Sequence, residues 1–532
     1  MHESSIQSVQ IVFLLLLLFV AGFTALARKL QTPYPIVLVV AGLLLSLIPG
    51  IPRITLNPDV VFLVVLPPLL FSAAWLTSWR DFVYNLVSIS FLAFGLVGFT
   101  VLGVAGAAHY AFPGFDWRLG VVLGAVIATT DAIAATSIAK RIGLPQRVVN
   151  VLEGESLLND ATGLLALEFG LVIVVAGQTP TFTSGFLRLA YLTAAGVGVG
   201  LLIGAVVHWV EHQIDDAPIE ITISILVPYA AYLAAEFIHA SGILAVVACG
   251  LYLGRGSAHF FSAAVRIQAN AVWSVFTFIL NGFVFVLIGL QLPLVREGIK
   301  TYSSGSLLLY GGLFSALVIV LRLLWVFPGA TLAYWIRRHF QRQKESRPPM
   351  RQIFVTGWTG MRGVIALAAA LSLPETLADG SPFPQRNLII FLTFSVILVT
   401  LVLQGLTLPA LIRALGLAGV TGPNCEETEA RRIMAEAALL ELEKAGKDVE
   451  ADSAALYEDL KEHYRRRLLS LPQDDGTQDG SYEKFVTVSL ELLRTERETA
   501  VKLRNSGRIS DEVLRQLLQE LDLSETRHRL PG

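Results

Sequence analysis

The chain has 532 residues, of which 54% are hydrophobic and only 15% are charged. Soluble proteins carry roughly 25% charged residues, so this composition excludes an ordinary soluble protein and indicates a membrane protein. The charge is unevenly distributed, because 24 of the 42 acidic and 17 of the 40 basic residues follow Asn424. We therefore predict two domains, a transmembrane domain over 1–420 and a cytosolic helical tail over 421–532.

The N-terminal segment contains an apolar run at 11–27. A secretory signal peptide carries positive residues before its apolar run. Here 1–10 contains no Lys or Arg, and Arg28 and Lys29 follow the run instead. We therefore predict a first transmembrane helix with its N-terminus outside.

Hydropathy along the chain predicts an all-α membrane domain. A spanning helix needs about 20 mostly apolar residues, and thirteen segments meet or approach this length. The predicted spans are about 8–27, 33–49, 58–76, 83–110, 118–140, 147–176, 184–211, 219–239, 241–255, 268–294, 305–337, 352–373 and 387–416. The second and the ninth of these are the shortest.

Basic residues are distributed asymmetrically between the predicted loops. Loops after odd-numbered spans hold 15 Lys and Arg residues, whereas loops after even-numbered spans hold four. Positively charged loops stay in the cytoplasm, so we predict a cytoplasmic tail and, with an odd number of spans, an external N-terminus. The acidic loop at 211–216 is an exception, because it falls on the cytoplasmic side.

The stretch 128–163 contains Asp131, Glu155 and Asp160 within what is otherwise predicted to be membrane, and Glu153, nearer the cytoplasm, is expected only to line the entrance. A charged side chain at the centre of a bilayer costs ~3 kcal/mol or more on insertion scales. Such residues usually mark ion or proton pathways. The pattern indicates a protein in which Asp160 binds a cation or protons while the rest of the chain moves access from one side to the other.

The residues around Asp160 carry the oxygen ligands that small hard cations prefer. The oxygen-bearing side chains nearby are Thr129, Thr130, Asp131, Glu155, Ser156 and Asn159. Glu155 and Asn159 form one i,i+4 pair and Ser156 and Asp160 the next, so all four can point into one sector of the helix bundle. No cluster of His or Cys competes, so we expect neither a transition-metal site nor a cofactor.

The stretch 128–136 is rich in small and hydroxyl residues, which suit a broken helix, and a second interrupted segment lies at 356–363, where three glycines accompany Arg362. Two interrupted spans in corresponding halves of a transporter point to a binding site at the midplane. A buried arginine needs a partner, and we predict Glu155 for Arg362. Asp131, together with Thr129, is then expected to support the broken helix by facing the ends of its halves. Arg322 is open to two interpretations, a second buried pairing arginine or one that snorkels to the interface.

Four motifs carry a resemblance to a known family. They are VVLPPLLFSAAW (64–75), TTDAIAAT (129–136), LEGESLLNDATG (152–163) and GWTGMRGVIALAAALSLP (357–374). Together they resemble the monovalent cation:proton antiporter-1 family, which contains the NhaP and NHE types of sodium/proton exchanger. The resemblance covers nearly all of 1–420.

The resemblance implies an inverted-repeat antiporter fold with two broken crossing helices, spans 5 and 12, and a homodimer. It implies that Asp160 binds the ion beside Asn159, with Ser156 and Thr130 as further Na⁺ ligands. The Asn-Asp pair implies electroneutral exchange of one cation for one proton. It also implies that Glu155 and Arg362 form the buried ion pair of the family.

Two positions depart from the family pattern. Ala132 replaces a frequent proline after the aspartate of span 5, so the break there is less forced by the sequence. Ser72 stands where many bacterial relatives carry an acidic residue after the Pro-Pro motif of span 3. If that acid joins the network of Arg362 in relatives, Glu155 must hold Arg362 here without it.

The function that we predict is electroneutral Na⁺/H⁺ antiport by alternating access, with Li⁺ as a surrogate, for pH homeostasis at the plasma membrane. The chain is then not an enzyme, and its partners are lipid, the cation, the proton and a second copy, with no nucleic acid. The alternatives are K⁺/H⁺ antiport and a channel or solute symporter on the same scaffold. An intramembrane aspartyl protease is disfavoured, because no Gly-x-Gly-Asp motif surrounds Asp131 or Asp160.

Overall fold

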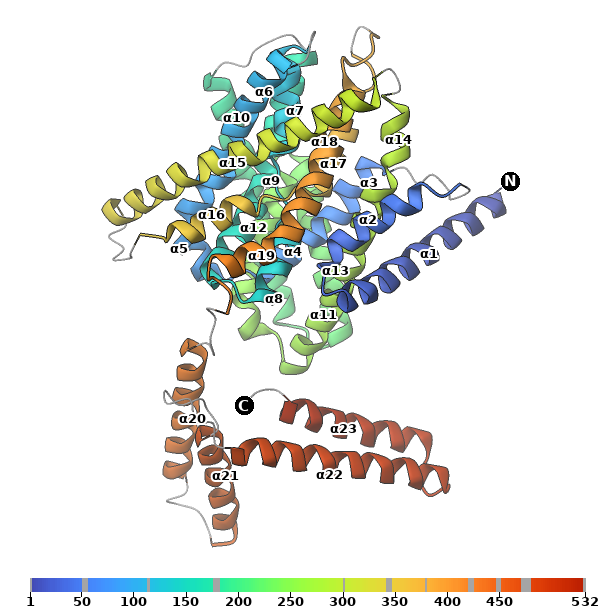
Figure 1. Ribbon diagram of the computed structural model, residues 1–532. Coiled ribbons are helices and arrows are strands. Elements are labelled where there is room, and N and C mark those ends of the chain that lie inside the picture. The colour runs from blue at the N-terminus through green and yellow to red at the C-terminus, as the bar shows by residue number, and fades with distance from the viewer. Residues whose placement is uncertain are drawn as a thin grey trace. The chain divides into compact units, whose positions relative to one another are not determined.

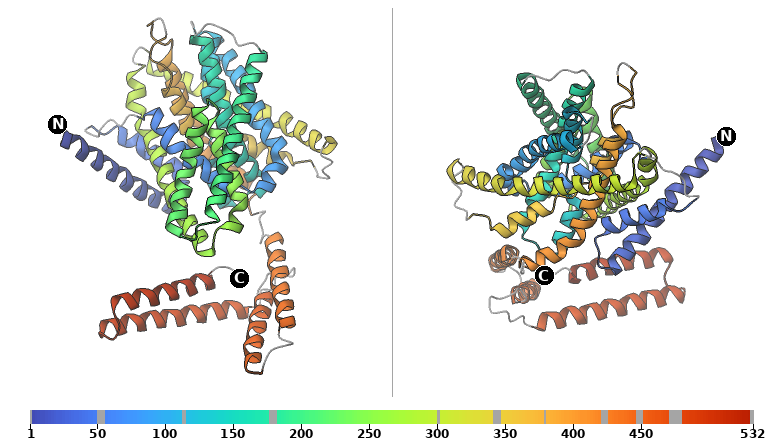
Figure 2. Two further views of the ribbon diagram at one scale, coloured as in Figure 1. Left: turned by 180° about the vertical axis from the view of Figure 1, so that it is seen from behind. Right: turned by 45° about the horizontal axis from the view of Figure 1, so that its top comes forward.

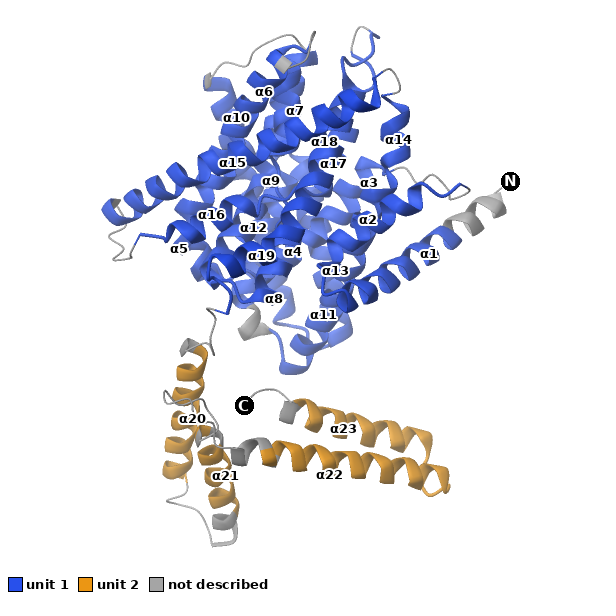
Figure 3. Ribbon diagram, viewed as in Figure 1, with its two compact units in different colours: residues 1–420 blue, residues 421–532 orange. Residues whose placement is uncertain are grey.

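The computed structural model describes residues 2–49, 56–111, 115–175, 182–299, 302–340, 347–377, 380–419, 425–445, 451–469 and 480–529. Within these ranges the chain is almost entirely helical, and only an isolated bridge joins Thr376 to Pro382. The chain divides into two compact units, Met1–Val420 and Thr421–Gly532, which we call the membrane unit and the tail unit (Figure 3).

The membrane unit is built from long apolar helices joined by short loops (Figure 1). Its first helices are α1 (His2–Lys29), α2 (Tyr34–Ser46), α3 (Pro58–Val60), the π-helical turn η1 (Val61–Val65), α4 (Leu66–Leu76), α5 (Trp79–Ser90), the π-helical turn η2 (Phe91–Leu96), α6 (Val97–Ala111), α7 (Trp117–Ala128), α8 (Ala132–Ile142) and α9 (Gln146–Val175). They are followed by α10 (Phe182–Glu211), α11 (Ala217–Phe237), α12 (Gly242–Phe260), α13 (Ala263–Leu290), α14 (Leu292–Glu297), α15 (Ser304–Phe340), α16 (Met350–Trp358), α17 (Val364–Leu371), α18 (Arg386–Val399), the π-helical turn η3 (Thr400–Gln404) and α19 (Gly405–Ala414).

Ten segments among the described residues are long and apolar enough to cross a membrane. Two further apolar helices, Tyr34–Ser46 and Gly242–Gly256, are shorter, and they correspond to the two shortest predicted spans. The predicted span at 352–373 consists of two short helices, α16 and α17, with a break between them. The chain is thus a multi-pass membrane protein, and the count of thirteen spans stays a prediction.

Small residues allow neighbouring helices of the membrane unit to approach closely. Gly120 and Gly124 of α7 lie against the backbone of Ala105 and Val101 of α6, where a Cβ on either glycine would clash. In lipid, where the hydrophobic effect does not drive helices together, such contacts between small residues let backbones pack. The view from behind shows α10, α11 and α12 side by side (Figure 2), and Gly196 and Gly200 of α10 lie against the backbone at Ser241 and Ala245, at the start of α12.

Two of the membrane-spanning segments are broken, and their breaks meet. The chain leaves the helix between α7 and α8 at 129–131, and again between α16 and α17 at 359–363. The backbone N–H of Asp131 donates a hydrogen bond of 2.9 Å to the carbonyl of Met361, which joins one break to the other. The prediction of two broken crossing helices is confirmed, and Ala132 in place of proline does not prevent the first break.

The tail unit consists of four helices with dense surface charge. They are α20 (Cys425–Ala445), α21 (Ala451–Leu469), α22 (Gly480–Asn505) and α23 (Asp511–Arg529). Helix α20 packs against α21, and α22 packs against α23. Arg497 of α22 contacts Asp522 and Glu525 of α23 at 2.6 and 2.7 Å, and its hydrogen bonds to Glu525 and Asp522 raise the pKa of this guanidinium above its usual value.

Candidate ion-binding site

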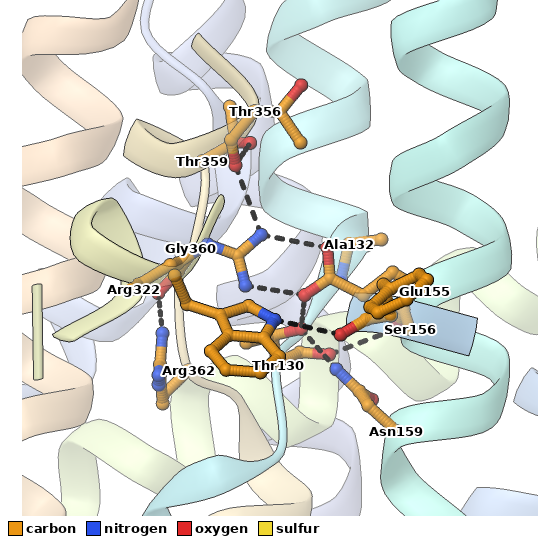
Figure 4. A network of polar contacts seen from close by, with 12 residues as sticks. Thr130, Ala132, Glu155, Ser156, Asn159, Arg322, Thr356, Thr359, Gly360 and Arg362 are labelled. Carbon is orange, nitrogen blue, oxygen red and sulfur yellow. Dashed lines mark hydrogen bonds and ion pairs between the residues drawn. The ribbon is translucent and has the colours of Figure 1, made fainter. Parts of the chain in front are cut away.

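The centre of the membrane unit contains a buried ion pair between Glu155 of α9 and Arg322 of α15 (Figure 4). Both side chains are 1% exposed. The two terminal nitrogens of Arg322 donate to the two carboxylate oxygens of Glu155 at 2.5 and 2.8 Å, and one of them also donates to the carbonyl of Thr356 at 3.1 Å. This two-point geometry is the strong form of an arginine–carboxylate contact.

The predicted pairing of Glu155 with Arg362 is therefore wrong as a contact, and Arg322 takes that place. The side chain of Arg362 donates hydrogen bonds to backbone carbonyls instead. Its Nε donates to the carbonyl of Ile127, at the C-terminal end of α7, at 3.0 Å, and a terminal nitrogen donates to the carbonyl of Gly360. A helix C-terminus carries unpaired carbonyls and partial negative charge, so the break itself supplies the acceptors that Arg362 needs.

Hydroxyl and amide side chains from the first break and from α9 extend the network around Glu155. Thr130 donates its hydroxyl to Glu155 at 3.1 Å and accepts a hydrogen bond from the amide of Asn159. Ser156 donates to the carbonyl of Thr130 at 3.0 Å and accepts a hydrogen bond from the backbone N–H of Ala132 at 3.3 Å. These contacts hold the first break against α9.

Asp131 lies where the N-terminal ends of two half-helices come together. Its carboxylate accepts a 2.8 Å hydrogen bond from the backbone N–H of Ile133, which makes it the cap of α8. It also lies against Gly363, the residue before α17, where a Cβ would be only 2.6 Å from the Cβ of Asp131. Helix N-termini favour negative charge, so this placement suits the predicted support of the broken helix. Thr129 lies in the same break, and its hydroxyl reaches only to Val126 at 3.5 Å.

Asp160 differs from the other two carboxylates of the site in having no such partners. It is buried, with 4% of its surface exposed, and it borders a cavity of about 180 Å³. Among the residues that the structure describes, none forms a hydrogen bond or ion pair with its side chain. The carboxylate of Asp160 is thus available to whatever enters the cavity.

The cavity has one polar and one largely apolar wall. The polar wall comes from the break before α8, from α8 itself and from α9, and it includes Asp131, Ser156 and Asp160. The other lining residues come from η1, α4, α13 and the start of α17, and they are apolar apart from Asn281. A cation in this space therefore has oxygen ligands only from part of the lining.

Several features of the site could not be assigned from the sequence. Arg322 lies alone in a long apolar segment, which signals burial but not its partner. Asn281 is a polar residue in the apolar run 268–294, the same type of signal. Ser72 donates to its own helix, to the carbonyl of Leu69 at 3.0 Å, and it does not line the cavity. Arg362 donates to two backbone carbonyls, and its second terminal nitrogen has no hydrogen-bond partner among the described residues.

The arrangement combines ion-exchange chemistry with a fixed charge balance. Arg322 neutralises the charge of Glu155, and both carboxylate oxygens of Glu155 accept hydrogen bonds from it. The part of the chain that the structure describes gathers no group of three or more His, Cys, Asp or Glu residues that could hold a metal ion. Asp160 is a carboxylate without a partner among the described residues, and oxygen ligands of this kind suit protons and hard monovalent cations.

Comparison with known proteins also indicates a transporter of cations and protons. Residues 14–414 match the family described as sodium/hydrogen exchanger, transmembrane. A Na⁺/H⁺ exchanger of Mycobacterium bovis is 34% identical over 515 residues, which are 94% of this chain and 93% of the relative. A sodium, potassium, lithium and rubidium/H⁺ antiporter of Bacillus pumilus is 34% identical over 412 residues, which are 75% of this chain and 60% of that protein.

The fold also has a counterpart among solved structures. The sodium proton antiporter MjNhaP1 from Methanocaldococcus jannaschii superposes with a TM-score of 0.59 at 18% identity, over 77% of this chain and 99% of that one. This likeness confirms the predicted antiporter fold. The chain therefore belongs to the sodium/hydrogen exchanger family, whose members are transporters of monovalent cations and protons rather than enzymes.

Proposed function

We propose that the protein exchanges one Na⁺ for one proton at the carboxylate of Asp160. The observation that carries the proposal is the contrast between the carboxylates of the site. Glu155 is bound by Arg322 and Thr130, and Asp131 caps α8. Asp160 borders the cavity with no partner among the described residues.

The charge balance of the site supports electroneutral exchange. A single carboxylate binds either one Na⁺ or one proton, so each occupied state carries the same charge across the membrane. The ion pair between Glu155 and Arg322 is neutral in both states. Alternating access requires that each ligand stabilise an occupied form that can reorient, and a neutral Asp160 satisfies this with either ligand.

The oxygens around Asp160 support a small hard cation as the substrate. Ser156 lines the cavity beside it, and the backbone carbonyl of Thr130 lies within hydrogen-bond distance of that serine. Asn159 keeps its carbonyl oxygen buried without a hydrogen-bond partner, so it can turn toward an ion. We take Na⁺ as the substrate and Li⁺ as its surrogate. The Bacillus pumilus relative is named an antiporter of potassium and rubidium as well as sodium and lithium, so K⁺ belongs in any test of selectivity.

The cellular setting follows from the charge of the loops. The excess of Lys and Arg in loops after odd-numbered spans supports a cytoplasmic tail and an external N-terminus in the plasma membrane. In this orientation the exchange would serve pH homeostasis. We further propose a homodimer, in line with the family that the motifs resemble.

The decisive experiment uses the purified protein in proteoliposomes with a pH-sensitive dye inside. Asp160→Asn should abolish proton movement driven by a Na⁺ gradient, because the amide cannot exchange a proton for a cation. Asp59→Asn, an exposed aspartate outside the cavity, is the matched control and should retain exchange. Retained exchange in Asp160→Asn would refute the proposal.

A panel of cations distinguishes the proposed function from its alternatives. Na⁺, Li⁺, K⁺ and choline are supplied in turn, first with the membrane potential free and then with the potential clamped. Electroneutral exchange should not respond to the clamp, whereas flux through a channel should. A rate that is the same for K⁺ and Na⁺ would replace Na⁺/H⁺ by broader cation/H⁺ antiport.

A further inference from the structure

The cavity that contains Asp160 includes a second pair of charged residues. Lys140, in the last turn of α8, and Glu153, near the start of α9, both line it. The ammonium of Lys140 lies 2.8 Å from the carboxylate of Glu153. Their side chains are 59% and 25% exposed, whereas Asp160 is 4% exposed. The pair therefore lies at the open end of the cavity, which we call the mouth.

Glu153 lies in line with Asp160 on α9. Seven residues make about two turns, so the two carboxylates are about 10 Å apart along the helix axis and project from nearly the same face. Ser156 lies between them, three residues after Glu153 and four before Asp160, and all three line the cavity. A cation that leaves Glu153 thus meets the hydroxyl of Ser156 before it reaches Asp160.

The contact between Lys140 and Glu153 is of the type that a dissolved cation can displace. A partly exposed ion pair contributes little stability, because water screens it and long side chains lose freedom in forming it. Lys140 also lies at the C-terminal end of α8, whose partial negative charge holds an ammonium nearby when Glu153 releases it. The charged residues lining the described cavity are Asp131, Lys140, Glu153 and Asp160, so no second cationic group competes for Glu153 there.

We propose that Glu153 is a first binding position for the transported cation at the mouth, and that the ammonium of Lys140 is a tethered competitor that occupies it when no cation is present. Lys140 keeps the mouth close to neutral, so that Glu153 attracts cations less strongly than it would alone. This inference rests on the proposed exchange at Asp160 and assigns the step that precedes it.

Transport kinetics test the proposal in proteoliposomes. Lys140→Gln should lower the KM for Na⁺ about three- to tenfold, because Glu153 then focuses cations at the mouth without a competitor, and Glu153→Gln should raise it by a similar factor. The double variant should return close to the wild-type KM, and the maximal rate should stay within about twofold throughout. The matched controls are Glu168→Gln and Arg188→Gln, which break a similar ion pair of α9 with α10 at 3.1 Å, outside the cavity, and should leave the KM unchanged.

Cation binding separates failure of this inference from failure of exchange at Asp160. In the detergent-solubilised full chain carrying Asp160→Asn, adding Lys140→Gln should produce stabilisation by NaCl over choline chloride in a thermal unfolding assay, and adding Glu153→Gln as well should remove it. A KM that neither single variant shifts, or that both shift in the same direction, would overturn the proposal. So would the absence of Na⁺ stabilisation in the Asp160→Asn, Lys140→Gln variant, whatever the transport assay gives.

Discussion

The task of each carboxylate in the site depends on which donors surround it. Glu155 receives two N–H groups from Arg322 and the hydroxyl of Thr130. Asp131 receives the backbone N–H that starts α8. Asp160 receives none of these among the described residues, and it borders the cavity. Three carboxylates that look alike in the sequence are thus divided into a structural partner, a helix cap and a group without a partner, which is the one that we propose for exchange.

Competition at Asp160 predicts how transport depends on pH. Protons and Na⁺ share one carboxylate, so acidifying the medium should raise the apparent KM for Na⁺, approaching about tenfold per pH unit once the carboxyl is mostly protonated. The maximal rate at saturating Na⁺ on the same side should change much less. Initial rates in proteoliposomes at several pH values measure both quantities. A KM independent of pH would mean that the two ions bind at separate groups.

The buried pair predicts a large loss of stability on removal of one partner. Glu155→Gln leaves the charge of Arg322 buried without an opposite charge, which costs about 3–5 kcal/mol in comparable sites. Thermal unfolding of the detergent-solubilised protein should show a marked fall in Tm. Adding Arg322→Met to Glu155→Gln should recover much of it, because no unpaired charge remains.

A substitution of Arg362 is the control for the pairing of Glu155 with Arg322. Adding Arg362→Met to Glu155→Gln should not recover stability, since Arg362 contacts the carbonyls of Ile127 and Gly360 and not Glu155. Recovery through Arg362 but not through Arg322 would restore the pairing that we had expected from the sequence.

The sequence could identify the charged residues of the site but not the pairing of Glu155. Arg362 lies beside glycines in a break, where backbone carbonyls are unpaired, and these carbonyls compete with Glu155 for it. Arg322 lies within helix α15, and its guanidinium binds the carbonyl of Thr356 and the side chain of Glu155. That side chain is on α9, 167 residues away, and no local pattern reports such a contact.

At the scale of elements, the two breaks operate as one structure. The hydrogen bond between Asp131 and Met361 joins them, Arg362 closes the C-terminal end of α7, and Asp131 faces the starts of α8 and α17. Positive and negative helix ends are thus each given an opposite side-chain charge. This arrangement exposes backbone polar groups in the membrane interior only where other protein groups satisfy them.

Gly363 tests how tightly the breaks are fitted together. A methyl group there would lie 2.6 to 2.9 Å from the side chain of Asp131, so Gly363→Ala should displace this cap and slow exchange at least about tenfold, as small misplacements at a site do. Gly357→Ala is the matched control, because the one close contact of its methyl group would be a terminal carbon of Leu323 at 2.9 Å, which can rotate away, and its next neighbours lie at 3.8 Å. Proteoliposome rates at equal protein content compare the two. Equal activity of both variants would show that the fit at Gly363 is not required.

A helix or a break was predictable from the sequence where its own residues show a characteristic pattern. Long apolar runs locate most of the helices, small and hydroxyl residues locate the first break, and glycines locate the second. The helices α2 and α12 were the shortest predicted spans, and the structure keeps them short. The sequence pattern does not predict that the two breaks cross. The crossing depends on which helices pack together, and close contacts between small residues determine this packing.

At the scale of the whole molecule, every residue assigned to ion exchange lies in the membrane unit, Met1–Val420. The cavity, the two breaks, the ion pair and the mouth are all formed within it. The tail unit has its own helix pairs, held by contacts such as those of Arg497 with Asp522 and Glu525. A unit with its own core can fold independently of its neighbour.

A chain that ends at Val420 should therefore retain exchange that depends on Asp160. Its KM for Na⁺ should lie within about twofold of the full chain, as expected when two units do not share a site. Size-exclusion chromatography establishes that the shortened protein is folded, proteoliposome rates measure exchange, and Asp160→Asn in the same background gives the zero level. A folded shortened protein without exchange would show that the tail unit takes part in transport. A normal maximal rate with a shifted pH dependence would instead assign the tail unit to regulation, because the ion-binding carboxylate itself is unchanged.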